Sequence, residues 1–75
     1  MNQETPDLYL AAYTVASGTP VHTTRRDGRR VFFGFDLGVE AWEKLQRDFH
    51  SGDGLVSGQK MAVATKALKG LISVT

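Results

Sequence analysis

Cysteine is absent from this sequence of 75 residues, so neither disulfides nor cysteine-ligated metal ions can stabilise the fold. A chain of this length forms one domain, which we place at residues 1–75, and it buries only about 60% of the surface that its unfolded form exposes. Self-association, or docking on a larger partner, would help to complete such a small core. The lack of cysteine gives no reason to expect an oxidising compartment, and we expect a cytoplasmic location.

Long apolar runs are absent as well. No stretch approaches the roughly 18 apolar residues that a membrane span requires, so we expect no membrane association. The first seven residues, MNQETPD, are polar and acidic, unlike a signal peptide. We expect residues 1–5 to be disordered ahead of the first helix.

A strong excess of charge of either sign is also missing, since the net charge is only +1. The charges are nevertheless unevenly distributed. Residues 22–30 contain four arginines and one aspartate, whereas residues 36–48 contain four acidic and two basic residues. Binding of a polyanion must therefore be local and not a property of the whole surface.

Residues 6–17 have the pattern of a first helix, because apolar residues recur there at helical spacing. Thr5 is the expected N-cap and Pro6 suits the first helical position. Gly18 suits a left-handed residue that ends the helix, and Pro20 prevents the helix from resuming.

A β-hairpin is expected at residues 21–35, where two β-prone runs flank Asp27 and Gly28. With these two residues as the turn, Arg26 pairs with Arg29, and the pairing continues outward. Side chains then alternate between two faces of the hairpin. The core face carries His22, Thr24, Val31, Phe33 and Phe35. The opposite face carries Val21, Thr23, Arg25, Arg30 and Phe32.

Two further helices complete an α+β fold of order α-β-β-α-α, in which an antiparallel hairpin packs against three helices. The first of them covers residues 37–50, with Asp36 as its N-cap and Gly52 at its end. The second covers residues 58–74 and follows Ser57 as its N-cap.

Five segments, in order along nearly the whole chain, carry a family resemblance: DLYLAAY at 7–13, RVFFGF at 30–35, FHSG at 49–52, Val56, and ALKGLI at 67–72. With these segments the chain resembles a family of small uncharacterised bacterial and phage-associated domains. The family pattern has an asparagine-like residue where this chain has Ser51. The resemblance implies the fold outline and supplies no catalytic residues.

Four arginines surround the hairpin turn, namely Arg25, Arg26, Arg29 and Arg30. Guanidinium groups match phosphate oxygens, and a two-stranded ribbon fits a major groove. This cluster is therefore a candidate nucleic-acid site, with help from the lysines of residues 58–74. The more frequent reason for such charge is a hairpin tip that resists aggregation at a sheet edge.

Phe32 lies with Val21 on the hairpin face opposite the core, where a solvated aromatic side chain is unusual. A second copy of the chain, the stems of Arg25 and Arg30, or an unpaired base would each cover it. We favour cover by a second copy or from within the chain. Phe32 and Val21 are accordingly the candidate interface residues.

The sequence contains no group of residues with the spacing that catalysis or cofactor binding requires. Asp48, His50 and Asp53 straddle a helix end and a loop, which is poor spacing for a metal site. Glycines within residues 52–58 do not match a phosphate-binding loop, and Ser51 beside His50 has no third group to orient it. We expect no enzymatic activity, metal, cofactor or small-molecule substrate.

The sequence thus favours a non-enzymatic accessory or interaction module that self-associates as a homodimer. The alternative is a nucleic-acid-binding domain that uses the arginine-rich hairpin. No motif specifies a protein partner or a biological process.

Overall fold

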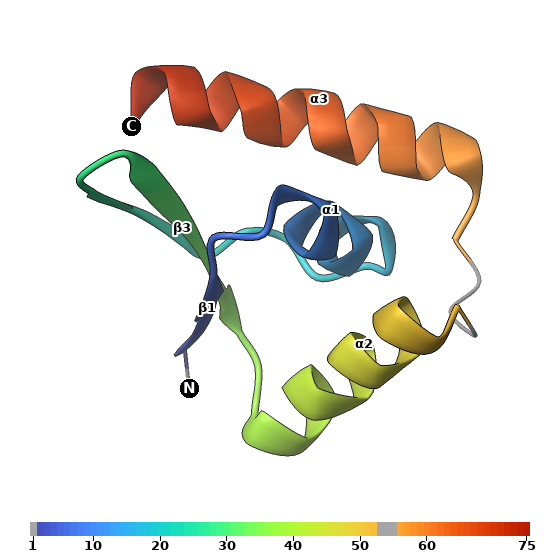
Figure 1. Cartoon of the computed structure of the whole chain (residues 1–75). Helices are drawn as coiled ribbons and strands as arrows, with labels where there is room; N and C mark the ends of the chain where they lie inside the picture. Colours follow the sequence, from blue (N-terminus) through green and yellow to red (C-terminus); the bar gives the residue numbers. More distant parts are fainter. Residues whose placement is uncertain (1, 53–55) are drawn as a thin grey trace.

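A three-stranded antiparallel sheet forms one layer of the fold, and three helices pack on one of its faces (Figure 1). This computed structural model describes residues 2–52 and 56–75. The elements are, in chain order, β1 (Asn2–Thr5), α1 (Leu8–Ala16), β2 (Thr23–Asp27), β3 (Arg30–Asp36), α2 (Val39–Ser51) and α3 (Gly58–Val74). The predicted α+β class and the order α-β-β-α-α are confirmed, with one strand added in front.

The added strand, β1, pairs with β3, so that β3 is the central strand in the order β1-β3-β2. The prediction of disorder is wrong for Asn2–Thr5, whereas Met1 lies outside the described residues. Thr5 is buried at the end of this strand, opposite Phe33. The sequence NQET shows no apolar alternation, because β1 is formed by pairing with β3 and not by its own pattern.

Helix α1 begins two residues later than predicted, because its N-cap is Asp7 and not Thr5. The Asp7 carboxylate accepts hydrogen bonds from the backbone N–H groups of Tyr9 and Leu10, at 2.9 and 3.2 Å. Gly18 follows the helix with a φ of 113°, as its predicted role requires. Five consecutive residues of α1, from 10 to 14, are buried, so this helix lies at the centre of the packing.

The hairpin turns at Gly28 and Arg29, one residue later than predicted, because Asp27 pairs with Arg30. Gly28 has a φ of 62°, and no other residue type has a positive φ in the described part of the chain. This pattern is that of a type II′ turn, which places glycine at the first central position.

Charge explains why the predicted register is wrong. That register sets Arg26 opposite Arg29, a like-charged pair that destabilises a ladder. The observed register sets Arg26 opposite Val31 and Asp27 opposite Arg30. The pairing slips by two residues, an even number, so the strand side chains stay on their predicted faces.

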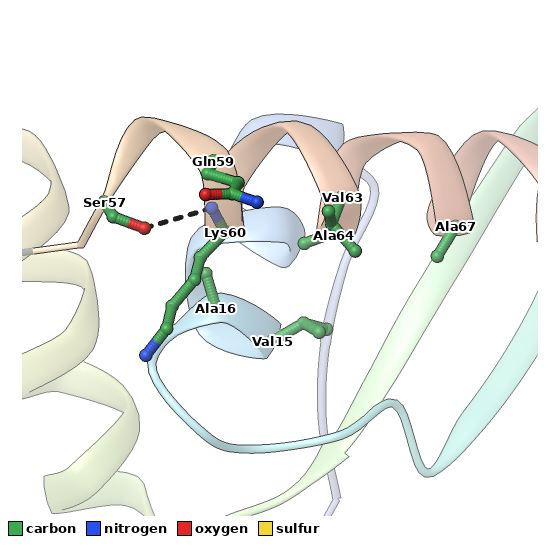
Figure 2. A pocket seen from close by; sticks show the side chains of 8 residues that line it. All are labelled: Val15, Ala16, Ser57, Gln59, Lys60, Val63, Ala64 and Ala67. Carbon is green, nitrogen blue, oxygen red and sulfur yellow. Dashed lines mark hydrogen bonds between the residues drawn. The ribbon is translucent and has the colours of Figure 1, made fainter.

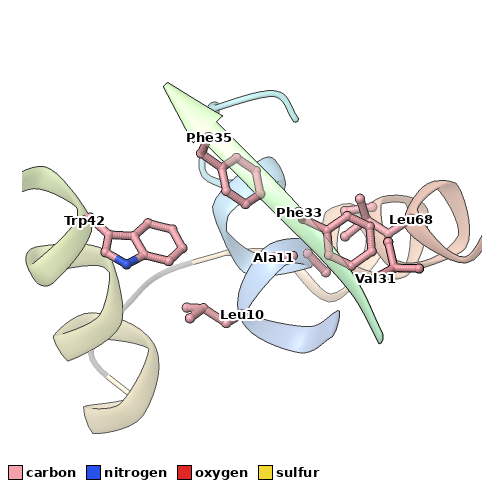
Figure 3. Close-up of a cluster of buried hydrophobic side chains, with 9 residues drawn as sticks. Leu10, Ala11, Val31, Phe33, Phe35, Trp42 and Leu68 are labelled. Carbon is pink, nitrogen blue, oxygen red and sulfur yellow. The ribbon is translucent and has the colours of Figure 1, made fainter. Parts of the chain in front are cut away.

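The hydrophobic core fills the space between the sheet and the helices (Figure 3). The central strand β3 contributes Val31, Phe33 and Phe35, which confirms the predicted core face for these residues. His22 and Thr24, predicted on the same face, are exposed. Phe35 stacks on Trp42 with ring centroids 5.8 Å apart, which attaches α2 to the sheet. The remaining buried members come from α1 and α3, namely Leu10, Ala11, Ala12, Ala64 and Leu68.

The last two helices differ in how closely they match prediction. Helix α2 begins at Val39 after Gly38, which has no capping side chain, so the predicted Asp36 cap is wrong. Gly52 ends α2 in the left-handed conformation, as predicted. Helix α3 has its predicted bounds, and Ser57 Oγ accepts the Lys60 N–H at 3.1 Å. Among the helices described, none is both long and apolar enough to cross a membrane.

Candidate interaction surfaces

The face of the sheet opposite the helices carries no helix, and we call it the open sheet face (Figure 1). The strand register places two charge types on it: the cations Arg25 and Arg30, and the anions Glu4, Asp27 and Asp36. Among the described residues, the two positive and three negative side chains give this face a net charge of −1. The open sheet face is therefore mixed in charge, although it holds two of the four hairpin arginines.

Phe32 lies half-buried on the open sheet face and is covered by Arg25 from within the chain. The guanidinium carbon of Arg25 lies 4.4 Å from the centroid of the Phe32 ring, in a cation–π contact. Arg25 Nε and Nη2 donate to the two carboxylate oxygens of Glu4, at 3.2 and 3.3 Å. Asp27 lies 3.9 Å from the same guanidinium. Arg25 of the same chain therefore covers the Phe32 ring, and cover by this arginine was one of the alternatives predicted from the sequence.

The carboxylates around Arg25 stabilise its charged form. The hydrogen bonds that Arg25 donates to the Glu4 carboxylate are the main cause that raises the pKa of Arg25, and the negative charges of Glu4 and Asp27 act in the same direction. Partial desolvation opposes them. The Glu4–Arg25–Phe32 arrangement was not predicted, because Glu4 belongs to the strand that the sequence does not reveal.

Gly34 is buried at the middle of β3, under Asn2 of β1 and Thr23 of β2. A Cβ at this position would overlap Oγ1 of Thr23 and lie 2.7 Å from Oδ1 of Asn2. The glycine therefore lets side chains from both edge strands close over the centre of the sheet.

Arg26 points to the other side of the hairpin and is bound to the end of α3. Its Nε donates to the main-chain oxygen of Thr75 at 2.9 Å, and its Nη2 donates to that of Ile72 at 3.1 Å. The last turn of α3 contains no basic residue of its own. Arg26 supplies the cation that the negative end of this helix favours.

Arg29 and Arg30 remain at the tip of the hairpin. Within residues 2–52 and 56–75, neither side chain makes a hydrogen bond or an ion pair. They line a hollow of about 410 Å³ together with Pro6, Asp7, Val31 and Ile72. The predicted four-arginine cluster is therefore divided into two engaged and two free guanidinium groups.

Val21 precedes β2, is half-buried and packs against the hydrophobic core. It does not share the surroundings of Phe32, so the two candidate interface residues do not form one exposed patch.

A second surface is a groove between the end of α1 and the first half of α3, which we call the α1–α3 groove (Figure 2). Its volume is about 580 Å³. Val63 at its edge is 65% exposed. The lining residues are Val15, Ala16, Ser57, Gln59, Lys60, Val63, Ala64 and Ala67. Sequence patterns did not indicate this groove, because helical spacing identifies core stripes and not the space between two helices.

Metal-binding geometry does not occur among the described residues, where no three His, Asp or Glu side chains gather. Of the sequence candidates, Asp53 lies outside the described residues, Asp48 binds Lys44 at 2.9 Å, and His50 packs edge-on against Phe49. His50 also lines a shallow hollow on α2 with Glu43, Gln46 and Arg47.

These features define a small α+β domain whose three-stranded sheet is covered by helices on one face. No family model, curated protein or solved structure matches the chain. The family resemblance noted in the sequence stays a prediction, and the interaction surfaces are the basis for a functional proposal.

Proposed function

We propose that this protein is a non-enzymatic interaction module that self-associates through its open sheet face. The observation that supports this proposal is a sheet face without helical cover that holds a half-buried aromatic residue among charges of both signs. In a two-fold dimer the same surface meets itself, and a face with charges of both signs allows the arginines of one copy to pair with carboxylates of the other.

Phe32 is the natural centre of such an interface. It lies on β3, the central strand, and its ring is already shielded on one side by Arg25. Interface residues that contribute most to binding are aromatic or arginine side chains near the centre of the contact. Two Arg25–Phe32 stacks packed about a two-fold axis would exclude water from both rings.

Sedimentation equilibrium tests the proposal. The wild type is expected at twice the monomer mass, and Phe32→Lys is expected at the monomer mass with unchanged helical circular dichroism. Tyr9→Lys is the matched control, because Tyr9 is an aromatic residue 61% exposed on α1, on the helical side of the sheet. A wild-type monomer throughout the micromolar range would refute the proposal, as would dissociation of both variants.

Nucleic-acid binding is the second candidate, and the free guanidinium groups of Arg29 and Arg30 favour it. Phosphate contacts depend on accessible cations. In this candidate Arg25 and Arg26 contribute little, because they are already bound to Glu4 and to the end of α3.

A further inference from the structure

The α1–α3 groove has an apolar lining made of small side chains. Val15 and Ala16 line it from α1, and Ala64 and Ala67 line it from α3 (Figure 2). A space of about 580 Å³ lies within the range of ligand sites in proteins. Val63 at the edge keeps 65% of its surface exposed, although burying a valine side chain is favourable. The groove thus offers apolar area to a ligand.

The described residues that line the groove carry charge of a single sign. Among them, Lys60 is the only charged residue. Helix α3 contains three lysines and no acidic residue, and α1 contains no charged residue. The first turn of α3 lacks a carboxylate, whereas the first turn of α2 contains Glu40. Lys60 and the positive end of α3 therefore both favour an anionic group at this end of the groove.

The shape of the groove selects the kind of ligand. Two helices line it, and its lining on α3 extends from Ser57 to Ala67, which is about 15 Å along the helix. A helix laid into such a groove contacts it through residues spaced i, i+4 and i+7. Two grooves packed against each other about a two-fold axis would bring lysine-bearing α3 helices together, so a second copy is disfavoured by its charge.

We propose that the α1–α3 groove binds an acidic amphipathic helix of a partner protein. Apolar residues of this helix contact Val15, Val63 and Ala67, and a carboxylate next to them pairs with Lys60. The site is separate from the open sheet face, so this proposal does not depend on self-association.

A displayed library of randomised helical peptides of about 16 residues tests the proposal, with the full chain as bait. Enriched peptides are expected to carry apolar residues at i, i+4 and i+7, with Asp or Glu beside them. In methyl NMR spectra, a selected peptide is expected to shift Val15, Val63, Ala64 and Ala67. The Phe32→Lys variant is expected to bind this peptide like the wild type, which separates the two proposals.

Substitutions on α3 provide the matched comparison. Val63→Glu is expected to weaken peptide binding at least about tenfold. Val74→Glu is the control, because Val74 lies on the same helix outside the groove and is 81% exposed. Lys60→Glu is expected to weaken acidic peptides about fivefold or more and to enrich basic ones.

Several outcomes would overturn the proposal. They are enrichment of basic peptides by the wild type, no enrichment at all, or shifts confined to the open sheet face. Groove shifts that grow with protein concentration without peptide would assign the groove to a second copy. A dodecanoate anion that shifts the same methyl groups more tightly than every peptide would assign it to an acyl ligand.

Discussion

Side chains on the open sheet face bind one another within the chain. Arg25 contacts Phe32, Glu4 and Asp27 together. An arginine that is bound in two directions is less available to phosphate than a solvated one. At this scale the aromatic residue and its cation act as one surface feature.

Gly34→Ala is expected to lower the free energy of unfolding by about 1–3 kcal/mol, because the new methyl group overlaps Oγ1 of Thr23. Urea denaturation followed by Trp42 fluorescence measures the loss, since Trp42 is the single tryptophan and is buried. The double variant Gly34→Ala with Thr23→Ala is expected to recover much of it, because the overlapping oxygen is gone. Strictly additive losses would place the cause elsewhere.

Elements of this fold are connected by single side chains as well as by the core. Arg26 joins the hairpin to the end of α3, and Trp42 joins α2 to the sheet. The C-terminal carbonyl groups of a helix lack partners within the helix, so a cation from another element is an effective cap.

Arg26→Ala is expected to destabilise the chain by about 1 kcal/mol and to expose the last turn of α3, because the oxygens of Ile72 and Thr75 lose their donor. Hydrogen exchange measures this change as faster exchange of amides in the last turn of α3. Arg29→Ala, which removes a neighbouring arginine without such contacts, is expected to leave exchange unchanged. Equal acceleration in both variants would show that the bonds from Arg26 do not stabilise the helix end.

Elements with local signals could be predicted from the sequence, and those formed by distant pairing could not. Helix α3 was predicted to the residue, because Ser57 and the apolar spacing lie within the helix itself. Strand β1 was missed because its pairing partner, β3, begins 25 residues after β1 ends. The hairpin register was missed by two residues because turn propensity was considered without the charges that the turn brings opposite each other.

The arginine cluster of the hairpin was also predicted only in part, for the same reason. The faces of Phe32, Arg25 and Arg30 follow from strand alternation and were predicted. The engagement of Arg26 and the contact of Glu4 with Arg25 depend on elements far apart in sequence. These contacts change the meaning of the arginine cluster, because they remove two of its four cations.

Over the whole molecule, exposed cations lie at the hairpin tip and along α2 and α3, and the tip carries the two free arginines of the hairpin. The tip of the hairpin lies beside the C-terminal end of α3 (Figure 1), and Arg29, Arg30 and Ile72 line one hollow there. The open sheet face has a net charge of −1, and the whole chain has +1. Within the hairpin, a nucleic acid would therefore be attracted to the tip, where Arg29 is free and Arg30 lies at the edge of the open sheet face.

This charge distribution predicts an asymmetry among the four arginines. Replacing Arg29 and Arg30 by alanine is expected to reduce the salt dependence of binding to a single-stranded oligonucleotide by about 1.4 log units of affinity per log unit of salt, because two phosphate contacts are lost. Replacing Arg25 and Arg26 is expected to change this slope little, since their guanidinium groups bind Glu4 and the end of α3. Fluorescence anisotropy of a labelled single strand, titrated from about 50 to 200 mM salt, measures both slopes. An equal reduction of the slope by the two double substitutions would show that all four arginines contact phosphate. A wild type that does not bind at the lowest salt would exclude nucleic acid as the ligand of the hairpin.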